Sequence, residues 1–257
     1  MRTRIAPTPS GFIHAGNLVN FVICAQIATE RNADVVLRID DLDQARVRAP
    51  YVEDVFRVLD WLGIAWHEGP RSSADLPTWS QVARMDAYRE ARDALVEQTE
   101  IFFVCTCTRT DYSRGSTCTC GSTPLPLETG RSALRMRTRT HGAPVMWRRD
   151  GLPAYHLASV VDDAIFDVDL VVRGVDLWAS TEIQRTLARH LPGSTFARAT
   201  VVHHGLVSGT DGSKLSKSAG ASASPLELTE DLRAAVDAWA RRLRSEDSAG
   251  DRSGVEA

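Results

Sequence analysis

The chain has 257 residues, of which 43% are hydrophobic and 25% charged, with a formal net charge of −3 and a pI near 6.2. That length suffices for one large domain, or for one domain with an insertion. The charge balance excludes a globally basic nucleic-acid-binding protein, so any RNA contact has to come from local arginine patches. No segment has the length of a membrane span, and the apolar stretch near the N-terminus lacks the cleavage site of a signal peptide. We therefore expect a cytoplasmic protein without membrane contact.

Alternating apolar patterns predict strands and helices in turn at both ends of the chain. The predicted order begins with a strand at 2–6, a helix at 17–31, a strand at 34–39 and helices at 50–62 and 80–98. Short strands follow at 101–104, 134–137 and 145–148, then strands at 155–161 and 168–172, a helix at 180–190, a strand at 199–203 and a helix from 225 to 243. Residues 34–39 are nearly all apolar, as a buried parallel strand requires. This order predicts an α/β protein with a parallel sheet interrupted by an insertion.

A turn rich in Pro and Gly, residues 7–11, joins the first predicted strand to a helix that opens on His14-Ala-Gly16-Asn17. Free amides at a helix N-terminus bind anions. Gly16 allows a ligand to approach the backbone, and His14 and Asn17 can form hydrogen bonds with phosphate or ribose. Ligands of open α/β sheets lie at the carboxyl ends of strands, where this turn is placed. The alternative is an ordinary tight connection between a strand and a helix.

Both lysines of the chain lie in one pentapeptide, Lys214-Leu-Ser-Lys217-Ser, whereas all the other basic residues among the 30 are arginine. Lysine is a compact charge on a flexible stem, which suits a triphosphate whose charge moves during a reaction. The alternative is a solvated polar loop in a chain with a compositional bias toward arginine.

Four of the five cysteines form two close pairs, Cys105/Cys107 and Cys118/Cys120. Thiolates in two such pairs can form a tetrahedral zinc site, and disulfides are rare in a reducing cytosol. With four protein ligands no position would be open for water, so we expect a structural zinc ion rather than a catalytic one. Free or redox-active thiols are the alternative. The remaining cysteine, Cys24, lies in an apolar helical stretch and is expected in the core.

The early His-Ala-Gly-Asn and late Lys-Leu-Ser-Lys-Ser motifs together resemble the two signature sequences of class I aminoacyl-tRNA synthetases. Residues 4–11, 37–46, 51–70 and 154–176 are similar to blocks of the glutamyl branch of that family. The resemblance implies a Rossmann-like parallel sheet in two halves. The domains expected are a first catalytic half at 1–100, a cysteine-bearing insertion at 101–150, a second half with the lysine loop at 151–222, a short helix at 223–244 and a disordered tail at 245–257.

The resemblance also implies a reaction, in which ATP activates glutamate to glutamyl-adenylate with Mg²⁺ accompanying the nucleotide. The catalytic residues implied are His14, Lys214 and Lys217. The ATP-binding residues implied are His14, Gly16, Asn17, Lys214 and Lys217. The glutamate-binding residues implied are Arg4, Thr8, Asp40, Arg46, Tyr155 and Arg173. For Arg4 and Asp40 an internal salt bridge is the alternative, and for Asp162 and Asp163 a structural role is expected.

Two departures from the glutamyl branch matter. Asp40 stands where that branch usually has Glu, and only one predicted helix follows the lysine loop. A catalytic half with a cysteine cluster and only one helix after the lysine loop most resembles the glutamyl-queuosine tRNA(Asp) synthetases, which place glutamate on queuosine in the anticodon of tRNA(Asp), and we expect it to act as a monomer. Another acceptor (a tRNA 3′ end, a small molecule or a carrier) and a non-catalytic RNA-binding paralog are the alternatives.

Overall fold

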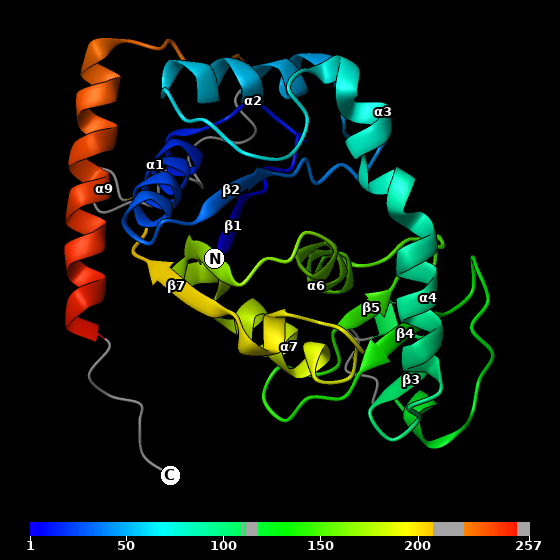
Figure 1. The fold of residues 1–257 in the computed structure, drawn as a ribbon. Helices are drawn as coiled ribbons and strands as arrows, with labels where there is room; N and C mark the ends of the chain where they lie inside the picture. The colour runs from blue at the N-terminus through cyan, green and yellow to red at the C-terminus, as the bar shows by residue number, and fades with distance from the viewer. Residues whose placement is uncertain (109, 112–117, 208–223, 251–257) are drawn as a thin grey trace. The chain divides into compact units, whose positions relative to one another are not determined.

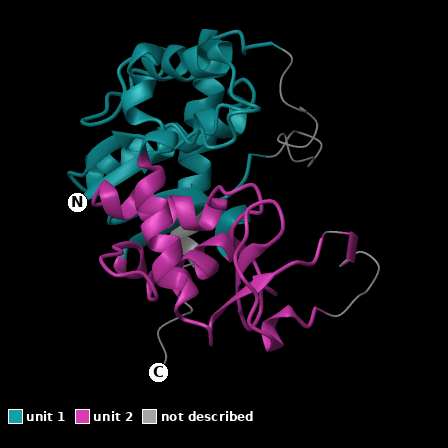
Figure 2. Ribbon diagram, turned by 90° about the vertical axis from the view of Figure 1, so that its right-hand side faces the viewer, with its two compact units in different colours: residues 1–83, 168–178, 199–257 teal, residues 84–167, 179–198 magenta. Residues whose placement is uncertain are grey.

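The computed structural model describes residues 1–108, 110–111, 118–207 and 224–250 (Figure 1). The chain divides into two compact units (Figure 2). Unit 1 comprises Met1–Ala83, Val168–Trp178 and Ala199–Ala257, and unit 2 comprises Arg84–Asp167 and Ala179–Arg198. Both units are therefore assembled from segments that lie far apart in the sequence.

Unit 1 contains the parallel strands. Strand β1 (Arg2–Ile5) pairs with β2 (Asp34–Leu37), and β6 (Leu170–Gly174) pairs with β7 (Thr200–His204). Strand β6 also lies beside β1, where the amide of Asp169 donates a hydrogen bond of 3.1 Å to the carbonyl of Arg2. Their carboxyl ends consequently bring residues from the beginning and the second half of the chain together, in the parallel α/β arrangement that the sequence predicted.

Helices cover the apolar strands of unit 1. Helix α1 (Ala15–Glu30) contacts β1, β2 and β6, and α9 (Glu230–Gly250) packs on α1 and β7 (Figure 1). Because α1 lies between the strands and α9, apolar side chains are buried on more than one of its faces, from Leu18 to Ile27. Helix α2 (Ala49–Trp61) is amphipathic and buries Val55, Val58 and Leu59.

Unit 2 contains an antiparallel sheet in the order β3-β4-β5. Its strands are β3 (Phe102–Cys105), β4 (Ala133–Met136) and β5 (Val145–Trp147). Helix α4 (Met85–Val96) packs on α6 (Tyr155–Ile165), which also contacts β5. Helix α7 (Trp178–Ala188) belongs to this unit apart from its first residue.

Short helices occupy the connections. They are α3 (Leu76–Trp79) and the 3-10 turns η1 (Ser73–Asp75), η2 (Gln81–Arg84), η3 (Cys120–Ser122), η4 (Val175–Leu177) and η5 (Phe196–Arg198). Among the residues that the structure describes, no helix is long and apolar enough to cross a membrane.

The structure corrects three sequence predictions of local structure. Residues 155–161, predicted as a strand, belong to helix α6, where Leu157, Ala158, Ser159 and Val160 are buried consecutively rather than in alternation. The single helix predicted at 80–98 is replaced by the 3-10 turn η2 followed by α4. Ser80, which precedes them, is extended, and its hydroxyl donates a hydrogen bond to the buried carboxylate of Asp41. The last helix begins at Glu230 rather than near 225, and it continues to Gly250, into the segment predicted to be disordered.

Candidate functional site

Two buried arginines lie near the carboxyl ends of adjacent strands in unit 1. Arg4 on β1 is 7% exposed and Arg173 on β6 is 2% exposed. The Nη1 atom of Arg4 donates a hydrogen bond of 3.4 Å to the carbonyl of Val172, the residue before Arg173. Guanidinium groups bind carboxylates through paired hydrogen bonds, so this edge of the sheet suits an acidic ligand.

The loop between β1 and α1 places His14 at the N-cap of the helix. The Oδ1 atom of Asn17 accepts a hydrogen bond of 3.2 Å from the His14 amide, and the Asn17 amide donates one of 2.8 Å to the His14 carbonyl. These two bonds close the first turn of α1. The Oδ1 atom of Asn17 therefore caps the helix in this structure. Burial lowers the pKa of His14, so its imidazole is neutral at pH 7.

Gly16 lies directly beneath the His14 ring. A methyl group added at Gly16 would come within 3.1 Å of Cε1 and 3.2 Å of Nδ1 of that ring. Such contacts are tighter than ordinary van der Waals separation, so a side chain at position 16 would crowd the imidazole, and glycine leaves it room. The three residues of the predicted ATP motif, His14, Gly16 and Asn17, thus form one compact structural element.

A buried carboxylate on α2 fixes the same loop from the other side. Asp54 is 3% exposed and its Oδ2 accepts a hydrogen bond of 2.8 Å from the amide of Ile13. Its Oδ1 pairs with Arg57 at 2.6 Å, and Arg57 in turn donates to the carbonyl of Leu226. Helix α2 therefore connects the loop before His14 to the segment that leads into α9.

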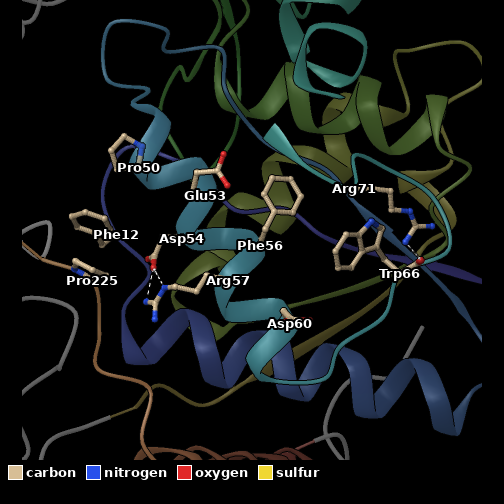
Figure 3. A pocket seen from close by; sticks show the side chains of 10 residues that line it. All are labelled: Phe12, Pro50, Glu53, Asp54, Phe56, Arg57, Asp60, Trp66, Arg71 and Pro225. Atoms are coloured by element: carbon tan, nitrogen blue, oxygen red, sulfur yellow. Dashed lines mark hydrogen bonds and ion pairs between the residues drawn. The ribbon is translucent and has the colours of Figure 1, made fainter. Parts of the chain in front are cut away.

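A cavity of about 720 Å³ opens beside these residues (Figure 3). It is lined by Phe12, Pro50, Glu53, Asp54, Phe56, Arg57, Asp60, Trp66, Arg71 and Pro225. Arg71 stacks over the Trp66 ring at 5.2 Å, and Figure 3 shows both side chains at one end of the cavity. None of the predicted substrate-binding residues lines this cavity. The cavity is therefore not the predicted substrate site.

Asp40 has a partner on its own segment. Arg38 Nε donates to Asp40 Oδ1 at 2.7 Å, and Arg38 Nη2 donates to Oδ2 at 3.2 Å, so the pair is bidentate. The amides of Arg38 and Asp40 donate to the carbonyls of Ile5 and Pro7, which extends the β1–β2 pairing beyond both strands. Asp40 consequently lies beside the end of β1, close in the fold to the loop before His14.

The other predicted site residues are more exposed or belong to unit 2. Thr8 is exposed in the turn after β1, and Arg46 is exposed and lies 4.0 Å from Asp43. Tyr155 is 46% exposed as the first residue of α6 in unit 2. Lys214 and Lys217 lie outside the described residues. Arg4, Arg173, Asp40 and the His14 motif all belong to unit 1, where Arg4 and Arg173 lie on neighbouring strands and the Asp40 backbone pairs with Pro7.

Two residues near this edge were not predicted from the sequence. His203 is the register partner of Arg173 on the neighbouring strand, and Trp178, 56% exposed, contacts its ring. The signal available in the sequence was the pair His203-His204 at the end of an apolar strand, which is unusual for polar residues of that size.

Asp162 is buried in unit 2 with complementary partners. It is fully buried and accepts hydrogen bonds from Arg84 Nε at 2.7 Å and from the Tyr88 hydroxyl at 2.6 Å. Burial together with the Asp162 charge raises the pKa of Tyr88, which keeps its hydroxyl protonated as a donor. This arrangement holds α4 against α6 and favours the structural role expected for Asp162.

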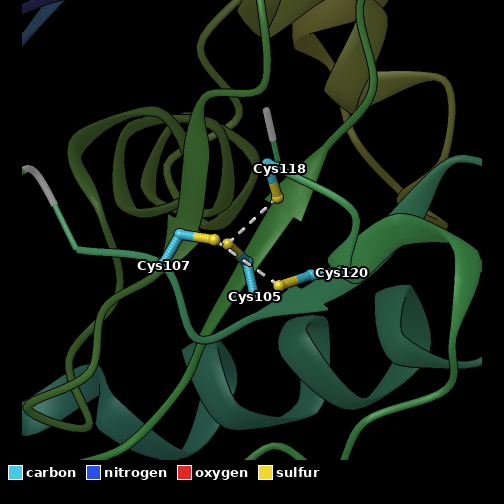
Figure 4. Close-up of side chains that lie close together, drawn as sticks. All are labelled: Cys105, Cys107, Cys118 and Cys120. Carbon is cyan, nitrogen blue, oxygen red and sulfur yellow. Dashed lines mark hydrogen bonds between the residues drawn. The ribbon is translucent and has the colours of Figure 1, made fainter. Parts of the chain in front are cut away.

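The four predicted metal ligands converge in unit 2 (Figure 4). The sulfur atoms of Cys105, Cys107, Cys118 and Cys120 all lie within 4.8 Å of one another. The Cys105–Cys118 sulfurs are 3.7 Å apart and the Cys107–Cys120 sulfurs 3.6 Å apart. Four sulfurs at about 2.3 Å from a tetrahedral zinc ion would be separated by about 3.8 Å, so the cluster fits this ion.

The thiols of the cluster influence one another's pKa. Burial opposes ionisation of Cys120, but hydrogen bonds with Thr106 lower its pKa to about 6. Burial and hydrogen bonding with Cys120 raise the pKa of Cys107 to about 12. Four adjacent sulfurs cannot all ionise without a cation, so binding of a metal ion here would release protons.

Comparison with known proteins accords with this arrangement. Residues 1–117 and 131–248 match the family described as tRNA synthetases class I (E and Q), catalytic domain. The glutamyl-Q tRNA(Asp) synthetase of Aromatoleum aromaticum is 36% identical over 83% of this chain and 73% of its own length. That of Methylococcus capsulatus is 34% identical over 86% of this chain and 76% of its own length. A glutamate–tRNA ligase of Myxococcus xanthus is 30% identical over 84% of this chain and 52% of its own length.

The chain spans about half the length of the glutamate–tRNA ligases that it matches. Among solved structures, the glutamate-tRNA synthetase of Elizabethkingia anophelis superposes with a TM-score of 0.66 and 19% identity, covering 85% of this chain and 52% of that one. That likeness shows a shared fold, and the relatives and structural neighbours are aminoacyl-tRNA synthetases. The chain therefore belongs to the class I glutamyl/glutaminyl-tRNA synthetase catalytic-domain family.

Proposed function

We propose that the chain uses ATP to activate glutamate as glutamyl-adenylate and transfers the glutamyl group to queuosine in tRNA(Asp). The observation that supports glutamate is the pair of buried guanidinium groups, Arg4 and Arg173, on adjacent strands at the carboxyl edge of the sheet. Support for queuosine comes from the two relatives named glutamyl-Q tRNA(Asp) synthetase, which are more similar to the chain, at 34% and 36% identity, than the glutamate–tRNA ligases compared with it, at 28–32%.

The first step joins two substrates without a protein nucleophile. A carboxylate oxygen of glutamate attacks the α-phosphorus of ATP, the bond to the β-phosphate oxygen breaks, and pyrophosphate leaves with its electron pair. Positioning and stabilisation of charge are then what the protein supplies. Arg4 and Arg173 hold the side-chain carboxylate, which leaves the α-carboxylate as the reacting group. In the second step a hydroxyl of the acceptor attacks the glutamyl carbonyl carbon and releases AMP.

The His14 motif holds the nucleotide. The neutral imidazole of His14 donates or accepts one hydrogen bond to ribose or phosphate, and Gly16 leaves room for the ring because it has no side chain. The α1 amides face the phosphates, where the positive end of the helix dipole favours anions. Lys214 and Lys217 stabilise the charge that develops on the leaving pyrophosphate. Mg²⁺ is expected on the phosphate oxygens of ATP rather than in a protein site.

The contribution of Asp40 to binding the glutamate ammonium group is limited by its ion pair with Arg38. Because Arg38 engages both of its oxygens, Asp40 can meet the glutamate ammonium group only with lone pairs that remain beside that pair. Thr8 and Tyr155 supply hydroxyl contacts, and Arg46 matches a family position associated with preferring glutamate over glutamine, as the resemblance implies. Selection for the acid over the amide then rests mainly on Arg4 and Arg173.

The cysteine cluster is proposed as a structural zinc site. The sulfur separations of 3.6 and 3.7 Å match a tetrahedral ion, and four protein ligands leave no place for a reacting water. The ion would hold the end of β3 to the turn η3 in unit 2. Elemental analysis of carefully purified protein should give close to one zinc per chain, and less than about half an equivalent would contradict the site.

The amino-acid half of the proposal is tested by ATP–pyrophosphate exchange with glutamate, with and without tRNA. Exchange with glutamate and little with glutamine supports it, and no exchange with glutamate under any condition refutes it. Arg173→Lys should raise the KM for glutamate by about tenfold or more, because a lysine cannot pair bidentately with a carboxylate. The same substitution at exposed Arg31 is the matched control and should leave KM unchanged.

The acceptor is tested separately by charging purified tRNAs. Queuosine-containing tRNA(Asp), the same tRNA without queuosine, and tRNA(Glu) are each offered with labelled glutamate. Charging of the first alone supports the proposal. Charging of tRNA(Glu) supports the second candidate, transfer to a tRNA 3′ end, which the similarity to glutamate–tRNA ligases at 29–30% identity favours.

A further inference from the structure

Asp54 on helix α2 is a buried carboxylate that the proposed reaction does not use. It is 3% exposed, and its two oxygens have different partners. Oδ2 accepts a hydrogen bond of 2.8 Å from the amide of Ile13, and Oδ1 accepts bonds of 2.9 and 2.6 Å from Nε and Nη2 of Arg57 (Figure 3). A buried carboxylate is costly unless such bonds replace its water, so these contacts keep the charge inside unit 1.

The amide that Asp54 holds lies one residue before the N-cap of α1. Ile13 is 4% exposed, so water is not at hand to replace the carboxylate as the acceptor. His14 follows directly and begins the turn that carries the ATP motif. The bond from Asp54 therefore fixes the direction in which the chain enters α1, and with it the place of His14.

A second contact from the same face of α2 holds the same loop. The rings of Phe12 and Tyr51 meet edge to face, with centroids 4.9 Å apart and planes at 83°. Tyr51 and Asp54 are three residues apart in α2, so they lie on one face of this helix. That face is consequently matched to two successive residues of the loop before His14.

The loop also borders the cavity of about 720 Å³, which Phe12 and Asp54 both line (Figure 3). Empty volume offers no atoms that resist a shift of the groups beside it. The contacts with α2 are therefore what determines where this part of the loop rests. Without the Asp54 carboxylate, the Ile13 amide would lose its acceptor and the loop would have room to move.

Arg57 orients the carboxylate from its other side. Its side chain is 40% exposed, whereas that of Asp54 is 2% exposed, and the guanidinium meets Oδ1 with two of its nitrogen atoms. Nη2 also donates a hydrogen bond of 3.2 Å to the carbonyl of Leu226. The arginine thus has a fixed position of its own, which lets it hold the Asp54 side chain toward Ile13.

We propose that Asp54, oriented by Arg57, is a positioning residue for the nucleotide site, because it fixes the Ile13 amide and thereby the place of His14. The inference rests on the proposed function, in which His14 meets the ribose or a phosphate of ATP. Asp54 acts through the backbone. It does not contact the substrates, and it transfers no proton.

The test compares Asp54→Ala, which removes the acceptor, with Asp54→Asn, which keeps a neutral acceptor of the same shape. Val55→Ala, a fully buried neighbour on α2, is the control for lost stability. Equilibrium dialysis gives the Kd for ATP with Mg²⁺ and the Kd for glutamate, at a temperature where circular dichroism shows each variant folded. Asp54→Ala should raise the Kd for ATP by about 10- to 100-fold, the scale of a hydrogen bond to a charged group, and Asp54→Asn should recover much of this loss.

The Kd for glutamate should stay at the wild-type value in every variant, and Val55→Ala should lower the melting temperature without changing either Kd. A purely structural role of Asp54 would reduce the number of binding sites per chain and leave the Kd for ATP unchanged, which overturns the inference. An equal rise in both Kd values, or a rise in Val55→Ala as large as in Asp54→Ala, also overturns it.

Arg57→Gln keeps the inference testable if Asp54→Ala does not fold, since Arg57 is partly exposed. It should raise the Kd for ATP by about two- to fivefold, the scale of a partly screened pair, and a wild-type Kd for ATP in both Arg57→Gln and Asp54→Asn contradicts the inference. Glutamate-dependent exchange by wild type is measured in parallel. ATP binding that depends on Asp54 without any such exchange would refute the proposed function and still support the positioning role.

Discussion

Replacing Asp40 with Asn would remove one charge from a nearly buried ion pair while preserving the shape of the side chain. The side chains of Arg38 and Asp40 are 2% and 12% exposed, and they pair through contacts of 2.7 and 3.2 Å. In the variant, the Arg38 guanidinium would stay buried opposite a neutral amide that also offers a donor in place of an acceptor. The change therefore tests how strongly this carboxylate stabilises the end of the β1–β2 pairing.

The expected effect is a decrease of about 3–5 kcal/mol in the free energy of unfolding, the range for removing one partner of a buried pair. Asp86→Asn is the matched control, since Asp86 pairs with Arg89 at the same distance of 2.7 Å but is 97% exposed. An exposed pair contributes little because water screens it, so this control should unfold close to wild type. Urea unfolding at neutral pH measures both.

The same variant separates two roles of Asp40. If the carboxylate mainly holds Arg38, Asp40→Asn loses stability while the KM for glutamate in pyrophosphate exchange changes little at a temperature where the variant stays folded. A loss smaller than about 1 kcal/mol, which is the scale of a surface pair, would show that the buried pair does not stabilise the fold. A large rise in KM together with unchanged stability would instead assign the carboxylate to the ammonium group of the substrate.

Three further substitutions test other parts of the site. Gly16→Ala should weaken ATP binding, because the new methyl would lie 3.1 Å from the His14 ring. The melting temperature should stay the same or rise, because Ala favours a helix over Gly by about 1 kcal/mol. A Kd for ATP equal to that of wild type would contradict this reasoning. Lys217→Arg should lose most glutamate-dependent exchange without unfolding, since a planar fork cannot replace a compact ammonium, and near-wild-type exchange refutes it. Tyr88→Phe should lower the free energy of unfolding by about 1–3 kcal/mol, because Asp162 loses a bond of 2.6 Å. Burial raises the pKa of Tyr88 above 10.0, so the contribution of its hydroxyl to the free energy of unfolding should be fully present below pH 10.0 and be lost above it. Urea unfolding on both sides of that pH should show a smaller fall in the free energy of unfolding for the Phe variant than for wild type.

The parts of the fold that could be predicted from sequence are those where a short segment decides its own structure. The apolar run 35–37 forms the buried part of a strand, and the repeat of apolar residues from Leu18 onward forms a helix. The division of the predicted helix 80–98 could not be read in this way. The buried carboxylate of Asp41, far away in sequence, accepts hydrogen bonds from the Ser80 hydroxyl at 2.6 Å and the Gln81 amide at 2.8 Å.

Helix α6 was mistaken for a strand for a related reason. Its apolar run contains Val160 and Val161, which favour strands locally, but its fully buried Asp162 requires the partners Arg84 and Tyr88. A helix places Asp162 toward α4, where those partners are found. Such a tertiary requirement outweighs the preference of two β-branched residues, and a single sequence does not display it.

The candidate site shows the same limit. The residues Arg4 and Arg173 were inferred from resemblance, and the structure places them on adjacent strands, although their contact with substrate stays a prediction. The contact between Trp178 and His203 was missed, because Trp178 begins helix α7 whereas His203 lies on β7, and no local pattern connects them. Pairing across a sheet depends on which strands become neighbours, and that is decided by the packing of the whole unit.

The substitution of Asp for the usual Glu at position 40 has a local physical explanation. Arg38 and Asp40 are two residues apart on an extended segment, so their side chains point to the same side. With one methylene, the Asp40 carboxylate stays close to the backbone and meets the Arg38 fork with both oxygens. A carboxylate shared in this way presents a weaker negative potential to an ammonium group than one without a cation beside it. Recognition of the amino acid then has to depend more on its side-chain carboxylate, and hence on Arg4 and Arg173, which is why lysine at position 173 should impair glutamate binding so strongly.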